Sequence, residues 1–280
     1  MQHIVDTTRY PILSLSGRAG RALVEAVRHD LRTNGCAVLP GFLRPEALRE
    51  GVAECARSRA GGAVFAKARD HNVYMSTPDQ RLPAEHPAHV LQRREQGYIA
   101  FDQLELTSIF RQLYESEALT NFVCEATERQ LHRSADPIAC APISVMEPGT
   151  SFPWHFDEND VTLTLMLQPA SSGGSFEFCP NLRSADDENA AAVRAVLDGD
   201  RRGVVESPLG AGDLQLFHGQ NSLHRVSAVG EGSPPRYLFA PAWNDAPGLV
   251  NTVERSITSY GRALEVHRNR AAAGRDGLRG

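Results

Sequence analysis

The sequence predicts a mainly β protein of the jelly-roll class with flanking helices. Helical periodicity dominates residues 1–135, whereas residues 140–245 hold about eight short strand-like segments separated by Gly, Pro, Asn or Asp. Many short strands joined by frequent turns are typical of a jelly roll. No internal repeat or low-complexity linker divides the chain, so its 280 residues are expected to form a single domain.

Composition narrows the range of partners. The chain has 29 Lys and Arg against 34 Asp and Glu, a net charge of −5, which gives no basic field for nucleic acid or an anionic membrane. It contains no apolar run near the ~18 residues that span a bilayer and no signal-peptide pattern at its start, so we expect a cytoplasmic location. Five widely spaced cysteines without a C-x-x-C pair argue against a disulfide framework or a structural zinc site.

The N-terminal part is expected to be mostly helical. Apolar residues at helical spacing, such as Val27 and Leu31, mark the first helix, and Pro45 suits the first turn of the second. The expected elements are helices over 18–33 and 44–59, a helical pair over 104–133, and a short strand at 36–39. Residues 61–100 show no clear period apart from an expected strand at 72–76.

The second half is expected to form the jelly-roll core, over 140–245. Its expected strands are Ile143–Glu147, Phe152–Phe156, Val161–Gln168, Ser175–Cys179, Val204–Ser207, Leu214–Phe217, Leu223–Val229 and Arg236–Trp243. Residues 185–203 are polar and helical in composition, which indicates a surface insertion. Part of this insertion, together with residues 61–100, is expected to close over a substrate as a lid. Residues 265–280 are expected to form a flexible tail.

A His-x-Asp pair stands on one of these strands. Residues i and i+2 of a strand point to the same face, so His155 and Asp157 present an imidazole and a carboxylate to one point inside the barrel. His224 lies on a later strand and supplies a third ligand. Two imidazoles and one carboxylate on one face, with open positions opposite, are typical of non-haem Fe(II) oxygenases. Zinc hydrolases usually place such ligands as H-E-x-x-H on a helix, so zinc is the weaker interpretation.

A buried arginine is expected downstream. Arg236 begins the strand that follows His224. A guanidinium binds a carboxylate through two parallel hydrogen bonds and stays ionised when partly buried. An inward Arg236 therefore suits a dicarboxylate.

Several motifs occur together between residues 143 and 243. They are His-x-Asp, a Gly173-Gly174 turn before an aromatic strand, the strand Gly212–Phe217, Leu-His-x-Val, and an Arg-Tyr strand ending at Trp243. This combination resembles the Fe(II)- and 2-oxoglutarate-dependent oxygenases of the prolyl-hydroxylase-like superfamily. The resemblance implies a double-stranded β-helix, or cupin-like jelly roll. It also implies an enzyme that uses Fe(II), 2-oxoglutarate and O₂ and releases succinate and CO₂, with His155, Asp157 and His224 as iron ligands and Arg236 on the cosubstrate.

Other segments resemble a narrower bacterial branch of hydroxylases and radical halogenases that act on free amino acids. They are Asn72-Val-Tyr74, Asp136-Pro137, Pro153-Trp154, Asn181-Leu-Arg183, Asp187-Glu-Asn189 and Tyr260-Gly-Arg262. Halogenases of this type carry a small residue in place of the ligand carboxylate, so that chloride can bind iron. Because Asp157 is present, the resemblance implies a hydroxylase.

The expected substrate is a small molecule, a free amino acid or an amino-acid-derived natural product. Glu158 and Asn159 follow the ligand segment and are candidates for contact with a substrate amine, with a solvated loop as the alternative. Desaturation and ring formation use the same ligands, and a non-catalytic, cupin-like metal-binding or sensor protein is a further alternative. A homodimer is one option for the assembly. The remaining candidates, His71, His86, His89, His218, Asp213 and Cys179, are expected to be structural.

Overall fold

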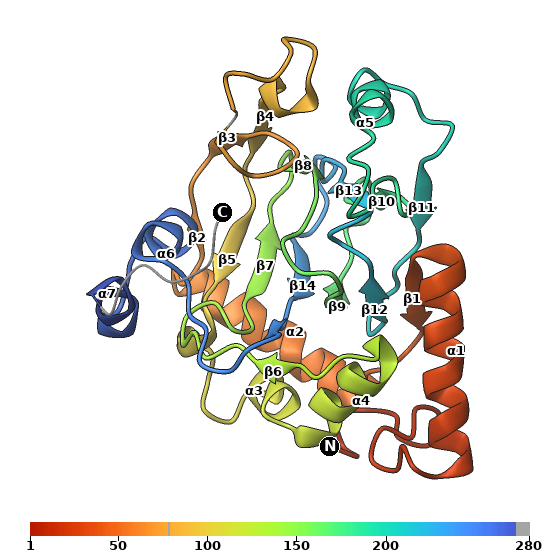
Figure 1. Cartoon of the computed structure of the whole chain (residues 1–280). Helices are drawn as coiled ribbons and strands as arrows, with labels where there is room; N and C mark the ends of the chain where they lie inside the picture. The colour runs from red at the N-terminus through yellow and green to blue at the C-terminus, as the bar shows by residue number, and fades with distance from the viewer. Residues whose placement is uncertain (78, 273–280) are drawn as a thin grey trace.

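The computed structural model describes residues 1–77 and 79–272 and has two facing antiparallel sheets at its centre (Figure 1). The larger sheet has the strand order β1-β12-β9-β14-β7-β5-β2. Its strands are β1 (Cys36–Leu39), β2 (Phe65–Ala66), β5 (Gly97–Ile99), β7 (Ile143–Met146), β9 (Thr162–Gln168), β12 (Leu214–Phe217) and β14 (Arg236–Phe239). These are close to the strands expected from the sequence, with β2 and β5 added from the N-terminal part.

The smaller sheet has the order β11-β10-β13-β8. Its strands are β8 (Phe152–His155), β10 (Phe176–Cys179), β11 (Val205–Ser207) and β13 (Leu223–Val226). Consecutive segments such as β8, β9 and β10 alternate between the two sheets, which is how a jelly roll is wound. The predicted fold class is therefore confirmed.

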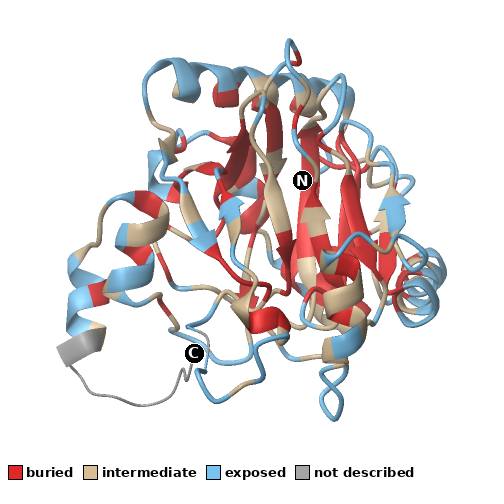
Figure 2. Ribbon diagram, turned by 90° about the horizontal axis from the view of Figure 1, so that it is seen from above, coloured by how far each residue is buried: buried red, intermediate tan, exposed pale blue. Residues whose placement is uncertain are grey.

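Helices cover the outside of the larger sheet and its edges, except α5, residues Ala190–Leu197, which packs against the smaller sheet (Figure 1). They are α1 (Arg18–Asn34), α2 (Pro45–Ala60), α3 (Ile109–Tyr114), α4 (Glu117–Thr127), α5 (Ala190–Leu197), α6 (Val253–Tyr260) and α7 (Glu265–Ala272), with 3₁₀ turns η1 (Pro87–His89) and η2 (Phe101–Gln103). Gly35 ends α1 with φ 68°, the left-handed conformation that glycine adopts readily, and Pro45 starts α2. Figure 2 shows these helices with exposed outer sides around mainly buried strands.

Two further pairs of strands lie beside the main sheets. They are β3 (Arg69–His71) with β4 (Gln92–Arg94), and β6 (His132–Arg133) with β15 (Trp243–Asn244). The expected strand 236–243 is thus two strands, because the segment between them contains Pro241, which has no N–H for a ladder.

The prediction of a strand at 72–76 was wrong. The side-chain oxygen of Asn72 accepts hydrogen bonds from the N–H groups of Tyr74 and Ser76, and its amide donates to the carbonyls of Ser76 and Ala88. These local bonds fold the segment into a turn instead of a strand, as asparagine often does.

The prediction of a flexible tail at 265–280 was wrong over residues 265–272. Those residues form α7, which His267 anchors with a fully buried side chain whose Nε2 lies 3.1 Å from the Asp136 carboxylate. Residues 273–280 lie outside the described residues. Within residues 1–77 and 79–272, no helix has the length and apolar character needed to cross a membrane.

Candidate metal centre

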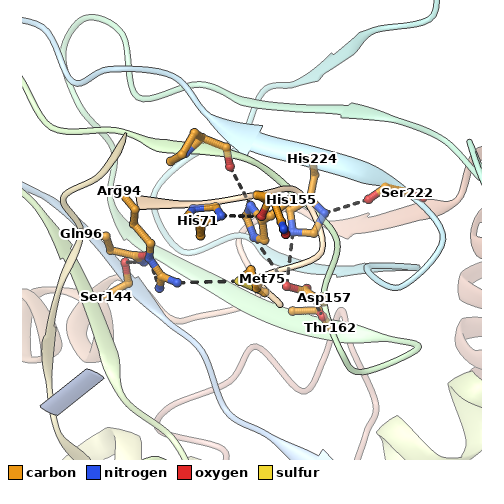
Figure 3. A network of polar contacts seen from close by, with 12 residues as sticks. His71, Met75, Arg94, Gln96, Ser144, His155, Asp157, Thr162, Ser222 and His224 are labelled. Carbon is orange, nitrogen blue, oxygen red and sulfur yellow. Dashed lines mark hydrogen bonds and ion pairs between the residues drawn. The ribbon is translucent and has the colours of Figure 1, made fainter. Parts of the chain in front are cut away.

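Two histidines from neighbouring strands face each other inside the smaller sheet. His155 ends β8, His224 lies on β13, and the two are register partners, with ring centroids 4.1 Å apart. Asp157 follows two residues after His155, where its N–H donates to the Gly219 carbonyl. One ligand-type atom from each of these three residues lies within 4.8 Å of the others (Figure 3). Strand pairing thus brings together the three residues that the sequence singled out.

The hydrogen bonds fix the tautomer of both imidazoles. Nδ1 of His155 lies 2.8 Å from the Pro153 carbonyl, and Nδ1 of His224 lies 2.8 Å from the Ser222 carbonyl. A carbonyl only accepts, so each Nδ1 carries the proton and each Nε2 keeps a free lone pair. These Nε2 atoms lie 3.6 and 3.4 Å from Oδ1 of Asp157. Three acceptors therefore converge with no proton between them, an arrangement that a divalent cation satisfies.

Burial and neighbouring groups determine the protonation states of His155 and Asp157. The side chains of His155 and His224 are 2% and 4% exposed, whereas Asp157 keeps 22%. Desolvation, and then the charge of His224, lower the pKa of His155 to about 3, so its imidazole is neutral at physiological pH. Burial alone would raise the pKa of Asp157, but the two imidazoles outweigh this effect and hold it well below its usual range. The site therefore offers the neutral imidazole of His155 and the ionised carboxylate of Asp157.

Two residues that sequence reasoning missed hold Asp157 in place. Thr162, at the start of β9, donates from its hydroxyl to Oδ2 of Asp157 at 2.5 Å. A Cβ on Gly219 would lie 2.4 Å from the same oxygen, so only glycine fits there. No local sequence pattern predicts these two contacts, because only the folded structure brings Thr162 and Gly219 to the Asp157 carboxylate.

Arg236 is buried on the inner side of β14, with 1% exposure. Its Nε has no hydrogen-bond partner, and no described carboxylate lies within ion-pair distance of its guanidinium. Burial lowers its pKa to about 10, so it remains a cation at neutral pH. Gly174, with φ 64°, lies against its side chain, where a Cβ would meet Cδ at 3.3 Å. An unpaired buried cation of this kind is costly unless an anion joins it.

The proposed substrate contacts lie at the rim of the site. Glu158 and Asn159 are exposed, and the Glu158 carboxylate pairs with Arg255 on α6. The structure thus places Glu158 close to the ligand segment but with its charge already paired.

Most residues expected to be structural have structural partners. Asp213 accepts hydrogen bonds from Gly41 and Gly210, as a turn residue does. Burial raises the pKa of Cys179 to about 11, which leaves an unreactive thiol. His71 and His218 each have one buried ring nitrogen without a hydrogen-bond partner. The ring of His71 lies beside that of His155, with 6.3 Å between the centroids, and its Nδ1 lies 2.7 Å from the Asn72 carbonyl.

The two segments expected to form a lid contact each other. The ring of His86, just before η1, lies 3.3 Å from the Glu188 carboxylate, and Arg194 of α5 donates to the Glu85 carbonyl at 3.2 Å. Figure 1 shows both segments at the same end of the molecule. Their closure over a substrate stays a prediction.

Comparison with known proteins places this architecture in a family. A family model described as halogenase D matches residues 89–256, more than half of the chain. A search of curated protein sequences returns no match.

Solved structures share the fold at low sequence identity. A prolyl-4-hydroxylase from Pseudomonas putida superposes with a TM-score of 0.51 at 17% identity, covering 80% of this chain and 99% of that one. The non-haem α-ketoglutarate-dependent epimerase SnoN, from nogalamycin biosynthesis, gives 0.54 at 16% identity, with 81% and 82% coverage. The carbocyclase SnoK from the same biosynthesis gives 0.53 at 17%, with 86% and 92% coverage.

These similarities confirm the predicted resemblance to oxygenases that use 2-oxoglutarate. The jelly roll is the one these enzymes share, and the converging histidines and carboxylate lie inside it. The chain therefore belongs to the halogenase D family.

Proposed function

We propose that the protein is an Fe(II)- and 2-oxoglutarate-dependent dioxygenase that hydroxylates an unactivated C–H bond of a small substrate. The substrate is a free amino acid or an amino-acid-derived natural product. The observation that carries the proposal is the convergence of three proton-free acceptor atoms, from His155, Asp157 and His224, inside the jelly roll. Nitrogen and oxygen donors of this type suit Fe(II).

Each residue has a defined task in this proposal. His155, Asp157 and His224 would hold the metal and leave its other positions open to cosubstrate and O₂. Iron with bound 2-oxoglutarate supplies the oxidation, with release of succinate and CO₂. Arg236 would bind the carboxylate of 2-oxoglutarate that is remote from the metal, which gives its buried cation a partner. Thr162 holds the Asp157 carboxylate in its orientation.

Succinate formation tests the proposal. The purified protein with Fe(II), 2-oxoglutarate and a panel of free amino acids should release succinate only when O₂ is present. His224→Ala should lose this activity, because one of three ligands is gone. The matched control is Arg225→Gln on the same strand, whose side chain points to the other face and pairs with Glu177 at 2.6 Å, and it should retain activity.

Two outcomes separate this proposal from the alternatives. A non-catalytic metal-binding or sensor protein would release no succinate above that of His224→Ala, and this result would overturn the proposal. Mass spectrometry of the oxidised substrate separates the reactions that share these cofactors. Hydroxylation adds one oxygen atom, whereas desaturation and ring formation each remove two hydrogen atoms.

Asp157 bears on the choice between hydroxylation and halogenation within this family. When iron is bound, its carboxylate would take the ligand position that chloride takes in the halogenases and would supply the negative charge. We expect Asp157→Gly to lose hydroxylation and to give little or no chlorinated product with excess chloride, since chlorination also depends on where the substrate C–H lies. Product analysis by mass spectrometry checks this. Hydroxylation at the wild-type rate would show that Asp157 is not a required ligand.

A further inference from the structure

The turn that joins β12 to β13 contacts two of the three candidate metal ligands. Its Gly219 carbonyl accepts a hydrogen bond from the N–H of Asp157 at 3.0 Å. Its Ser222 carbonyl lies 2.8 Å from Nδ1 of His224 (Figure 3). The first contact fixes the backbone at Asp157, and the second fixes the tautomer and the ring orientation of His224. The position of this ligand turn, residues 218–222, therefore determines where two of the three ligand atoms lie.

The segment that follows β10 holds the ligand turn in place. The backbone N–H of Arg183 donates to the Asn221 carbonyl at 3.1 Å, and its side-chain Nε donates to the Gln220 carbonyl at 2.7 Å. The N–H of Asn181 donates to the Ser222 hydroxyl at 3.1 Å. These bonds reach three consecutive residues of the ligand turn, and the guanidinium supplies the shortest of them.

The same guanidinium also contacts the segment that carries the other two ligands. Its central carbon lies 3.8 Å from the centroid of the Phe156 ring, and Phe156 stands between His155 and Asp157 in the sequence. Successive side chains of an extended segment alternate, so the Phe156 ring points away from the ligands and packs with Leu223 in an apolar cluster. A cation over an aromatic face is stabilising. The Arg183 side chain thus bridges the segment that carries His155 and Asp157 and the turn that leads to His224.

No ion pair explains the position of Arg183. Within residues 1–77 and 79–272, no carboxylate lies within ion-pair distance of its guanidinium, and Glu188 pairs with His86 instead. Arg183 is half-buried, and burial lowers its pKa. A partly buried charge is kept at a cost, so its favourable contacts are those with the ligand turn and the Phe156 ring. A planar guanidinium allows both, since its flat face stacks on the ring while an N–H in its plane donates sideways.

We propose that Arg183 is a positioning residue of the metal centre, which locks the ligand turn against the segment that carries His155 and Asp157. It fixes the distance between Asp157 and His224 before a metal binds, so that binding requires little rearrangement of the backbone. Contacts outside the ligands that orient them typically change metal affinity by about 10- to 100-fold. The inference rests on the metal centre of the proposed function, and it requires nothing of the substrate or of the reaction.

Titration of the metal-free protein with Co(II), followed by visible absorption, tests the proposal. Co(II) suits the same nitrogen and oxygen donors as Fe(II), and its absorption bands report the geometry of its ligands. Arg183→Met keeps an unbranched apolar stem but lacks the guanidinium, so it should bind Co(II) at least about 10-fold more weakly and with a changed spectrum. Arg183→Lys should lose less affinity, because its ammonium keeps a cation over the Phe156 ring.

The matched control is Arg202→Met. Arg202 belongs to the same insertion, its side chain is 91% exposed, and it pairs with Asp200 at 2.6 Å. Its Co(II) affinity should stay within about twofold of wild type, because such a surface pair contributes little. Far-UV circular dichroism establishes that each variant is folded at the temperature of the titration. If Arg183→Met does not fold, Arg183→Gln takes its place with the same expected loss of affinity.

The outcomes separate this inference from the proposed function. A purely structural role for Arg183 would lower the unfolding temperature of the variants and leave the affinity and the spectrum of bound Co(II) unchanged, and this result would overturn the inference. An equal loss of affinity in Arg202→Met would also overturn it. If wild-type protein binds no Co(II), or if His224→Ala binds it as tightly as wild type, the metal centre itself is refuted, and the proposed function fails with it.

Discussion

The two faces of the seven-stranded sheet are both buried, yet they carry different kinds of side chain. The face toward the helices is apolar, and it includes Leu163, Leu165, Leu167, Tyr237 and Phe239. The face toward the smaller sheet carries polar side chains that are less than 9% exposed, namely Ser144, Thr164, Gln215 and Arg236. Alternation along each strand sends neighbours to opposite faces, so the same strands supply both sets.

Burial therefore serves two different purposes in this sheet. Most polar side chains on the inner face bond to one another or to the β5 segment, as Thr164 does with Gln215 at 3.3 Å and Gln96 does with Ser144. Arg236 does not, and buried polar groups without partners are rare in proteins. The outer face, toward the helices, therefore stabilises the fold. The inner face, toward the smaller sheet, holds Arg236, whose guanidinium is free to bind a ligand.

The largest expected effect on stability comes from the outer face of β14. Phe239 is fully buried, with its ring centroid 5.2 Å from that of Phe110. Phe239→Ala should lower the free energy of unfolding by about 3–5 kcal/mol, since it removes apolar contacts and leaves a cavity. Urea unfolding measures this. Leu238→Ala, on the opposite face and only partly buried, should cost less, and equal losses would remove the distinction between the faces.

A substitution on the inner face of the same strand should not lower the free energy of unfolding. Arg236→Met removes a buried, unpaired cation, so the unfolding free energy should not fall. Affinity for 2-oxoglutarate should decrease by about 2–5 kcal/mol, or about 30-fold or more, because the carboxylate loses its partner. Titration of 2-oxoglutarate into the anaerobic Fe(II) protein measures the affinity. An unchanged affinity would move the anchoring role to another arginine.

A pH effect of intermediate size is expected from the smaller sheet. The pKa of His155 is about 3 in the folded protein and about 6.5 in the unfolded chain. The unfolded chain therefore takes up this proton first as the pH falls. The contribution of His155 to the stability of the metal-free protein is complete above about pH 6.5 and decreases toward pH 3.

Between pH 7 and pH 5 this loss amounts to about 2 kcal/mol. Urea unfolding of the metal-free protein at both pH values, compared with His155→Gln, isolates the contribution of His155. The variant lacks this group, so its stability should fall less than that of the wild type. Parallel pH profiles of the two proteins would contradict the low pKa.

The smallest effect is expected at the rim. Arg255 and Glu158 form an ion pair with side chains 47% and 63% exposed. Arg255→Gln should change the unfolding free energy by less than about 1 kcal/mol, because solvent screens such pairs. Thermal unfolding checks this. A loss above about 2 kcal/mol would show that α6 anchors the ligand loop.

Sequence patterns predicted most of the two main sheets and the three converging residues. His155 and Asp157 were recognisable because a strand places residues i and i+2 on one face, and the β half has clear turns between apolar segments. Arg236 could be singled out as a candidate for binding a carboxylate because it begins the strand that follows His224.

The β3–β4 hairpin was not predictable in the same way. Its strands are three residues long and polar, Arg-Asp-His and Gln-Arg-Arg, so they show no apolar alternation. Only the pairing register brings Arg69 opposite Arg94, and no local pattern encodes that register. The contacts of Thr162 and Gly219 with Asp157 depend on tertiary structure for the same reason.

The insertion between β10 and β11 has a consequence for how relatives of this protein diversify. Phe178 and Val205 flank it and are register partners, so the chain leaves and re-enters the sheet at adjacent positions. A segment with neighbouring ends can change in length at a small entropic cost, about 0.6 kcal/mol for each doubling. Its buried part is fixed, because Val193 of α5 packs in the same apolar cluster as Leu223 of β13, the neighbour of His224. Evolution or an engineer can thus lengthen the exposed part of this segment while the cluster that supports β13 stays as it is.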